Sequence, residues 1–246
     1  MIFNFILTFT GGLLAAGIGV AAGGGGIISV GVLTLLGLPL PMALATNRVG
    51  ALSASMTALY KYNKAKKIDW VLAFKLLPLG IIGGLLGSEL LNHTPTHLLK
   101  GLFISIIIVT IIMILFNPKI GLTETTKSKM INSIGYIVFL VLSLIGGLIG
   151  AGAGTIFIFM NSFFFGKTLL VAQATNMPSW LGLSLVASIV FASNNLVNIP
   201  LAIALLCGMS IGGYIGARLA ILKGNKFIKK LMIVMLIIVA IQILLS

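Results

Sequence analysis

The chain has 246 residues, of which 59% are hydrophobic and only 8% are charged. Because a soluble domain carries about a quarter charged residues, this composition excludes an ordinary soluble protein and indicates an integral membrane protein. Sixteen Lys and Arg against three carboxylates give a formal charge of +13, yet no basic region lies outside the apolar segments, so nucleic-acid binding is not expected. The single cysteine excludes an internal disulfide and a cysteine-based metal site.

Apolar segments follow one another along the chain with only short breaks between them. Residues 103–116 are almost continuously apolar, unlike the alternating strands of a membrane β-barrel, so the predicted fold class is an all-α helical bundle. A helix needs roughly 20 residues to cross a bilayer; eight segments approach or exceed that length, and two are too short. The ten segments, in chain order, are 2–20, 26–37, 40–60, 70–91, 98–116, 131–150, 154–165, 170–193, 199–222 and 227–245.

The two short segments, 26–37 and 154–165, share a distinctive context. Each follows a glycine-rich break, GIGVAAGGGG (17–26) in the first case and GGLIGAGAGT (146–155) in the second. Short, glycine-interrupted segments at matching places in two halves of a membrane protein point to the binding site of a transporter.

An internal repeat accounts for the matching places. Residues 17–90 align with residues 146–219 without a gap, at a constant separation of 129 residues. Shared glycines and a shared Ala-Thr-Asn triplet are harder to obtain by chance than shared Leu or Ala in so apolar a chain. The repeat divides one membrane domain into two five-segment halves, 1–124 and 125–246. Identical pairs include Gly17/Gly146, Gly23/Gly152, Gly25/Gly154, Gly37/Gly166, Ala45/Ala174, Thr46/Thr175 and Asn47/Asn176.

Basic residues predict which side of the membrane each loop faces, because cytoplasmic loops are enriched in Lys and Arg. Residues 61–67 (KYNKAKK) and 222–230 are rich in Lys and are expected inside. Residues 193–198 (SNNLVN), which correspond to 61–67, have no Lys or Arg and are expected outside. Equivalent loops then lie on opposite faces, so the repeats are inverted, and both termini are predicted outside.

The two breaks are candidate anion sites. A helix N-terminus exposes unpaired N–H groups and about half a positive charge, and glycine allows a ligand to approach them closely. Close packing of helices also gathers small residues, and we prefer that interpretation for the later glycines, Gly83, Gly84, Gly87, Gly212, Gly213 and Gly216. The residues expected around the anion are Gly23, Gly24, Gly25 and Gly26 in the first break and Gly152, Ala153, Gly154 and Thr155 in the second.

The repeated triplet adds polar side chains to this site. Two motifs within apolar segments, ALATNR (43–48) and AQATNM (172–177), contain Thr46, Asn47, Thr175 and Asn176. These side chains either hydrogen-bond a neighbouring helix or, brought together by symmetry, line a shared cavity. Arg48 follows the first triplet without a basic counterpart after the second, and it would offer a bidentate fork to an oxyanion. The alternative for Arg48 is a snorkelling or ion-paired side chain.

Other ionisable residues suggest little chemistry. Glu89 lies near the end of its segment, so an interfacial position is preferred, with proton coupling as the alternative. His93 and His97 lie in a short loop interrupted by a proline, and no metal site is expected there. Asp69 and Trp70 start the segment 70–91 as a predicted N-cap and interface anchor.

These residues resemble a known family. The stretch GIGVAAGGGGIISVGVLTLLGLPLPMALATN, followed by IDW and GIIGGLLGSEL, is similar to the first half of the TauE/SafE proteins, also called TSUP or sulfite exporters. GGLIGAGAGTIFIFM, GKTLLVAQATN and GGYIGARLA look like the second half. The sequence departs from the family pattern at Thr155, where further glycine is common, and at Asn198–Pro200, which replaces an acidic-Trp pair.

The resemblance implies a multi-pass transporter of the bacterial-type plasma (inner) membrane, whose characterised relatives export sulfite, sulfoacetate and related anions. We therefore expect a secondary transporter that carries a small sulfur oxyanion by alternating access, with no cofactor and no metal. An anion channel, or an uptake carrier for another anion, is the alternative; a membrane enzyme lacks a converging set of acids, bases or ligands. The lipid bilayer and the anion are the expected partners, and a homodimer is left open.

Overall fold

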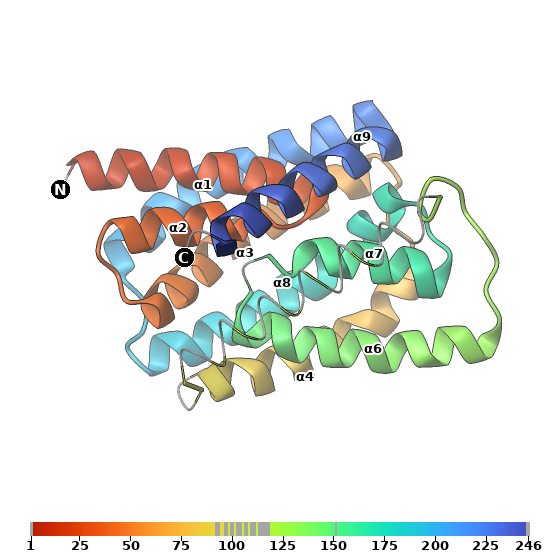
Figure 1. Cartoon of the computed structure of the whole chain (residues 1–246), viewed down its shortest axis with the longest axis horizontal. Helices are drawn as coiled ribbons and strands as arrows, with labels where there is room; N and C mark the ends of the chain where they lie inside the picture. Colours follow the sequence, from red (N-terminus) through yellow and green to blue (C-terminus); the bar gives the residue numbers. More distant parts are fainter. Residues whose placement is uncertain are drawn as a thin grey trace.

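The computed structural model describes residues 2–91, 119–150 and 152–244, together with residues 94, 95, 98, 101, 105, 108 and 112. Throughout this described part, the regular secondary structure is α-helical (Figure 1). Apart from these single residues, the predicted segment 98–116 lies outside the described residues, as do His93 and His97.

The helices follow the predicted segments closely. Both predicted short segments are short helices, α2 and α7, and each begins within the last residues of its glycine-rich break. By length and composition, α1, α4, α6, α8 and residues 199–235 of α9 can each cross a membrane, so the chain is a multi-pass helical membrane protein. The helices are α1 (Ile2–Ala22), α2 (Gly26–Leu35), α3 (Leu40–Lys64), α4 (Trp70–Leu91), α6 (Lys129–Leu148), α7 (Gly154–Phe165), α8 (Leu169–Ser193) and α9 (Ile199–Leu244).

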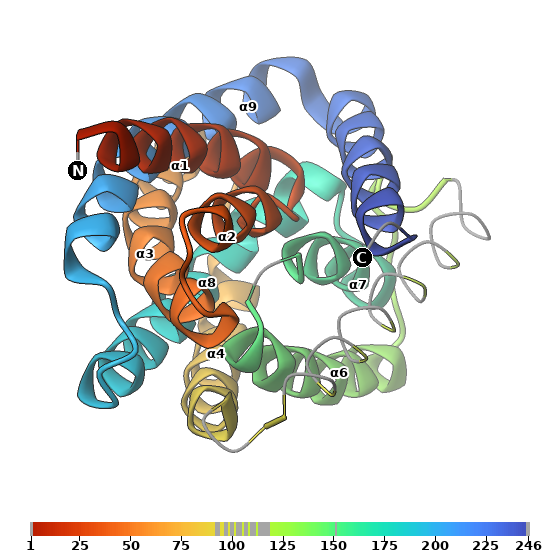
Figure 2. The same ribbon diagram turned by 60° about the vertical axis from the view of Figure 1, so that its left-hand side comes forward.

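The last two predicted segments, 199–222 and 227–245, are the two arms of α9. They meet at Gly224, whose backbone is non-helical (φ 68°, ψ −167°). Figure 2 shows the two arms on the outside of the bundle, and it shows the short helices α2 and α7 inside the ring formed by the longer ones.

Glycines set the packing of the long helices, as predicted. α9 lies along α1 and α3, and α4 lies along α6 and α8. At these crossings a side chain on the glycine would collide with the facing backbone: a Cβ on Gly87 would lie 2.0 Å from the Leu144 carbonyl oxygen, and one on Gly216 would lie 2.3 Å from that of Gly17. Small residues thus let helix backbones touch.

We expect Gly87→Ala to destabilise the protein, because its new methyl would force α4 away from α6. Overpacking of this kind costs about 1–3 kcal/mol. The thermal midpoint in detergent, followed by size-exclusion fluorescence, measures the loss. The matched control is Gly31→Ala on α2, where a Cβ meets nothing within 4 Å. Equal thermal midpoints for Gly87→Ala and Gly31→Ala would mean that the α4–α6 crossing tolerates a side chain.

Hydrogen bonds at the helix ends are reciprocal between the two halves of the chain. The backbone N–H of Asn198 donates to Thr46 Oγ1 (3.0 Å), and that of Asp69 donates to Thr175 Oγ1 (3.1 Å). Each residue of the second bond lies 129 positions from its counterpart in the first, with the two halves exchanged. The turns before these bonds match as well, with Lys66 at φ 54° and Asn195 at φ 55°. Equivalent positions of the sequence repeat therefore make equivalent hydrogen bonds.

Asp69 caps α4, as predicted, and it also joins two distant parts of the chain. Its Oδ1 accepts the N–H of Leu72 (3.0 Å), and its Oδ2 pairs with Lys167 Nζ (2.6 Å). Asn198 caps α9 in the same way through Leu201 N (3.2 Å), so the charge is not needed for the cap. Burial raises the pKa of the Asp69 carboxyl, but the hydrogen bonds from Lys167 and Leu72 outweigh it and leave the pKa below its usual value.

This lowered pKa predicts an acid-sensitive contribution to stability. The contribution is present above the unfolded-state pKa of about 4 and is lost as the pH falls through the lower folded-state value. Asp69→Asn keeps a capping oxygen and removes the charge, so its thermal midpoint should fall less than that of the wild type between about pH 5 and pH 2. Glu124→Gln, at an exposed carboxyl, serves as the control. Parallel acid profiles for wild type and Asp69→Asn would contradict the assignment.

Candidate functional site

The two glycine-rich breaks touch each other. Gly23 has a left-handed backbone (φ 77°), and a Cβ at this position would lie 2.2 Å from the backbone nitrogen of Thr155. A Cβ on Gly154 would lie 3.0 Å from Gly23 Cα, and Thr155 Oγ1 donates to the carbonyl of Ala22 (3.3 Å). Residues far apart in the sequence therefore form one backbone junction, which only a glycine at position 23 can make.

Both short helices begin at this junction without a side-chain cap. The N-cap residues are Gly25 for α2 and Ala153 for α7, and neither side chain accepts a hydrogen bond. In contrast, Ser128 caps α6 and Thr168 caps α8. The first N–H groups of a helix have no partner within it and carry partial positive charge. The junction thus presents two helix N-termini to whatever lies beside it.

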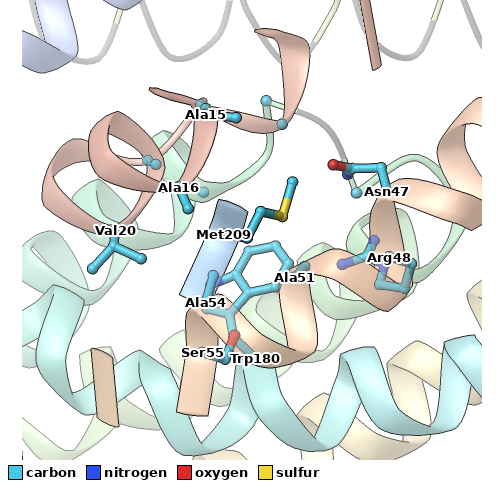
Figure 3. A pocket seen from close by; sticks show the side chains of 18 of the residues that line it. Ala15, Ala16, Val20, Asn47, Arg48, Ala51, Ala54, Ser55, Trp180 and Met209 are labelled. Carbon is cyan, nitrogen blue, oxygen red and sulfur yellow. The ribbon is translucent and has the colours of Figure 1, made fainter. Parts of the chain in front are cut away.

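A cavity of about 100 Å³ lies beside the junction, with room for several waters or one small anion. Figure 3 shows Asn47 and Arg48 on one side of this cavity and Ala16 and Val20 on the other. The described residues that line it come from α1, the two breaks, α3, α8 and α9: Ala15, Ala16, Gly19, Val20, Gly23, Gly24, Gly25, Gly26, Asn47, Arg48, Ala51, Ala54, Ser55, Gly150, Gly152, Gly154, Gln173, Met177, Trp180 and Met209.

Arg48 is the charged group of the cavity. It is 3% exposed, its Nη2 donates to the carbonyl of Gly146 at the end of α6, and its Cζ lies 5.7 Å from the centroid of the Trp180 ring. A Cβ on Gly150 would lie 1.8 Å from Nη2, so glycine makes room for the guanidinium. None of the three carboxylates pairs with Arg48: the ion pair that forms within the described part of the chain joins Asp69 and Lys167. A buried cation without a counter-ion is costly, and an anionic ligand would remove that cost.

The Asn residue of each repeated Ala-Thr-Asn triplet accepts a hydrogen bond that joins a short helix to the long helix after it. Ser29 Oγ on α2 donates to Asn47 Oδ1 (2.5 Å), and Asn161 Nδ2 on α7 donates to Asn176 Oδ1. Asn47 lines the cavity, where its amide group adds a donor to the guanidinium of Arg48. Asn176 is fully buried and is not among the described lining residues.

Several predicted site residues lie away from the cavity. Thr46 and Thr175 accept the reciprocal bonds from Asn198 and Asp69 at the helix ends. Ala153 and Thr155 are buried in the second break, behind the lining. Glu89 is exposed near the end of α4. The structure therefore brings together the glycines of both breaks with Asn47 and Arg48, and it keeps Ala153 and Thr155 at the junction without their lining the cavity, whereas Thr46, Thr175, Asn176 and Glu89 lie elsewhere.

Gln173 is a polar lining residue that was not among the predicted site residues. Its Nε2 donates to the carbonyls of Gly19 (3.1 Å) and Val20 (2.7 Å) in the last turn of α1, and its Oε1 has no partner among the described residues. The sequence feature that could have predicted it is a polar residue within AQATN (172–176), at the position where the first half has Leu44. Trp180 and Met209 were also missed, because an apolar side chain facing a cavity looks like one facing lipid.

Four polar side chains, Asn47, Arg48, Ser55 and Gln173, lie among the glycines and apolar residues that line the cavity. The part of the chain described by the structure contains no group of three or more His, Cys, Asp or Glu suited to a metal. A cavity with a few polar side chains between two broken helices, within a multi-pass bundle, is the architecture of a membrane transporter.

Comparison with known proteins identifies the family. The model of the sulfite exporter TauE/SafE family matches residues 8–243, so the chain belongs to this family, which consists of transporters and not of enzymes. A probable membrane transporter protein of Haemophilus influenzae is 24% identical over 93% of this chain and 90% of its own length. The probable membrane transporter protein ORF9 of a Sinorhizobium species is 26% identical over 98% and 91%, and YfcA of Escherichia coli, also a probable membrane transporter, is 23% identical over 90% and 82%. No solved structure matches the chain significantly.

Proposed function

We propose that this protein is a secondary transporter that exports a small sulfur oxyanion, sulfite or an organosulfonate, across the plasma membrane. The observation that carries the proposal is Arg48, a buried cation without a carboxylate partner in the described chain, in a cavity between two helix N-termini. The family name supplies the substrate class, and the donor groups of Arg48 and Asn47 in the lining support an anion.

In the proposed complex, the anion lies beside the junction of the two breaks. Arg48 supplies the charge, and its guanidinium can offer two parallel N–H groups to two oxygens. The amide of Asn47 adds a donor, and the starts of α2 and α7 add partial positive charge, although the N–H groups of Ile27 and Ile28 already donate to the carbonyls of Gly24 (3.2 Å) and Gly25 (3.0 Å). An anion with three oxygens, such as sulfite or a sulfonate, could accept hydrogen bonds from several of these groups at once. The site is built entirely within one chain, so the proposal needs no second copy.

We further propose that the two halves, 1–124 and 125–246, are inverted repeats that rock about this site. The reciprocal bonds of Thr46 and Thr175 support this arrangement. The packing supports it as well. α9 runs parallel to α1 and α3, and α4 runs parallel to α6 and α8. Since α3 and α4 are joined by the short turn 65–69 and run in opposite directions, α1 and its counterpart α6 also run in opposite directions. Alternating access then exchanges one set of equivalent contacts for the other.

Cysteine labelling tests this topology. In a Cys207→Ser background, a cysteine placed at Asn195 should react with an impermeant maleimide added outside intact cells. A cysteine placed at Lys66, its counterpart, should react only after the membrane is opened, because the repeats face opposite sides. Labelling of both positions from the same side would contradict the inverted arrangement and with it the prediction that both termini lie outside.

Flux in proteoliposomes tests the function itself. We expect sulfite or a sulfonate to cross more rapidly than chloride, at a rate that saturates with concentration and responds to an imposed pH or sodium gradient. Saturation reports a carrier, because each cycle requires a conformational change. A rapid flux that follows only the electrochemical gradient of the anion would replace the carrier by an anion channel. Absence of flux for every sulfur oxyanion would refute the substrate class.

A further inference from the structure

A second group of cations lies far from the cavity, where α3 ends and the first arm of α9 approaches Gly224. A groove of about 250 Å³ runs between these helices. Its described lining consists of three basic side chains and three apolar ones, with no carboxylate: Lys61, Lys64, Arg218, Ala65, Ile221 and Leu222.

The basic side chains of the groove are positioned but not neutralised. Lys61 Nζ donates to the hydroxyl of Tyr214 (3.0 Å) and lies 4.4 Å from the centroid of its ring. None of the three cations forms an ion pair within the described residues, where Lys167 and Asp69 pair with each other. Three like charges around one groove repel one another, and an anion placed between them would relieve that repulsion.

The fold itself does not require these cations. Positive charge near helix C-termini is favourable, but α8 and α4 end in the equivalent way at positions 129 residues away. There the counterparts of Lys61, Lys64 and Arg218 are Val190, Ser193 and Glu89. At these equivalent positions the described helix ends carry no basic side chain and one carboxylate, so the fold does not require the three cations of the groove.

We propose that this groove binds the headgroup of an anionic phospholipid. α3 and the first arm of α9 end here, which is the depth at which headgroups lie, and Tyr214, which contacts Lys61, is exposed beside the groove as in an aromatic interface belt. Arg218 and the two lysines match a phosphate, which Arg binds as a fork and Lys as a point charge. Leu222 is 70% exposed, and with Ile221 it offers an apolar wall to the first part of an acyl chain. Basic pockets between membrane helices bind anionic headgroups in this way.

Native mass spectrometry of the purified full-length protein, titrated with phosphatidylglycerol or phosphatidylcholine in detergent, tests this proposal. We expect one saturable phosphatidylglycerol site that phosphatidylcholine does not fill. The double variant Lys61→Gln/Arg218→Gln should weaken it about 30-fold. The control Lys66→Gln/Lys226→Gln removes the same charge from exposed side chains outside the groove and should leave the site intact.

Further measurements distinguish a lipid site from other anion binding. Arg218→Glu, which introduces the residue found at the equivalent place in the other half, should abolish the preference even if the double variant is poorly folded. Inorganic phosphate at the same concentration should not displace the lipid, because it lacks the acyl chain. Displacement by phosphate, equal affinity for the two lipids, or equal loss in the double variant and its control would overturn the proposal.

Discussion

Arg48→Met should abolish transport and, at the same time, raise the thermal stability of the ligand-free protein. Methionine is the residue that the second half carries at the equivalent position, Met177, and it removes the charge while keeping a long side chain. Losing a charge-assisted pair to a bound anion costs about 3 kcal/mol or more, which is at least about 100-fold in affinity. Removing a buried cation that has no counter-ion stabilises the empty protein by about 1–3 kcal/mol.

The two readouts together distinguish a ligand-binding arginine from a structural one. Arg48 also donates to the carbonyl of Gly146 at the C-terminal end of α6, where a cation favourably caps a helix. If capping were its main role, Arg48→Met would lower the thermal midpoint and leave anion binding unchanged. Arg48→Lys keeps the charge and loses the fork, so it should retain partial transport. Flux in proteoliposomes and melting in detergent, with and without sulfite, measure both effects.

Gly23→Ala should also eliminate transport, because it separates the two breaks. The added methyl would lie 2.2 Å from the backbone nitrogen of Thr155, which belongs to the other half and cannot move without displacing the start of α7. The junction would open, the N-termini of α2 and α7 would no longer face one cavity, and the protein would be destabilised by several kcal/mol. Anion-dependent protection in a thermal melt, together with flux, measures the loss.

Gly37→Ala is the matched control for this variant. Gly37 has the same left-handed backbone (φ 88°), but a Cβ there meets nothing within 4 Å. The control therefore carries the conformational cost of about 1–2 kcal/mol without the collision. We expect it to melt somewhat earlier than the wild type and to transport normally. Equal behaviour of the two variants would show that backbone strain, and not contact between the breaks, governs the effect.

Much of the fold follows from the pattern of apolar residues. The length of each apolar run predicts the long helices, and the glycine clusters predict where α2 and α7 begin, because helix geometry and the bilayer leave few alternatives. The predicted boundary between segments 199–222 and 227–245 is also present, because the backbone of α9 is non-helical at Gly224. The crossing glycines were also assigned correctly to packing, because an added Cβ would lie within 3.0 Å of facing backbone at all six of them: Gly83, Gly84, Gly87, Gly212, Gly213 and Gly216.

The site was harder to predict, because position along a helix decides which polar side chains reach it. Thr46 and Asn47 are neighbours in the sequence, yet one ties a loop at the helix end and the other lines the cavity. The Ala-Thr-Asn triplet alone does not show that the side chains of Thr46 and Asn47 point in different directions. Gln173 has no counterpart in the first half, so the repeat gave no reason to select it. The repeat predicted the place of the proposed site, whereas Arg48 and Gln173, two of the polar residues that line the cavity there, correspond to Met177 and Leu44 at the equivalent positions of the other half.

Fluorescence of Trp180 offers the most direct test of the central claim that an oxyanion binds beside Arg48. Trp180 lines the cavity, and the chain has only one other tryptophan, Trp70, which Trp70→Phe removes. In this background, sulfite should change the emission of Trp180 in a saturable manner, and the additional change Arg48→Met should abolish the response. A response that stays linear in sulfite concentration, and that is the same with and without Arg48, would contradict the proposed site.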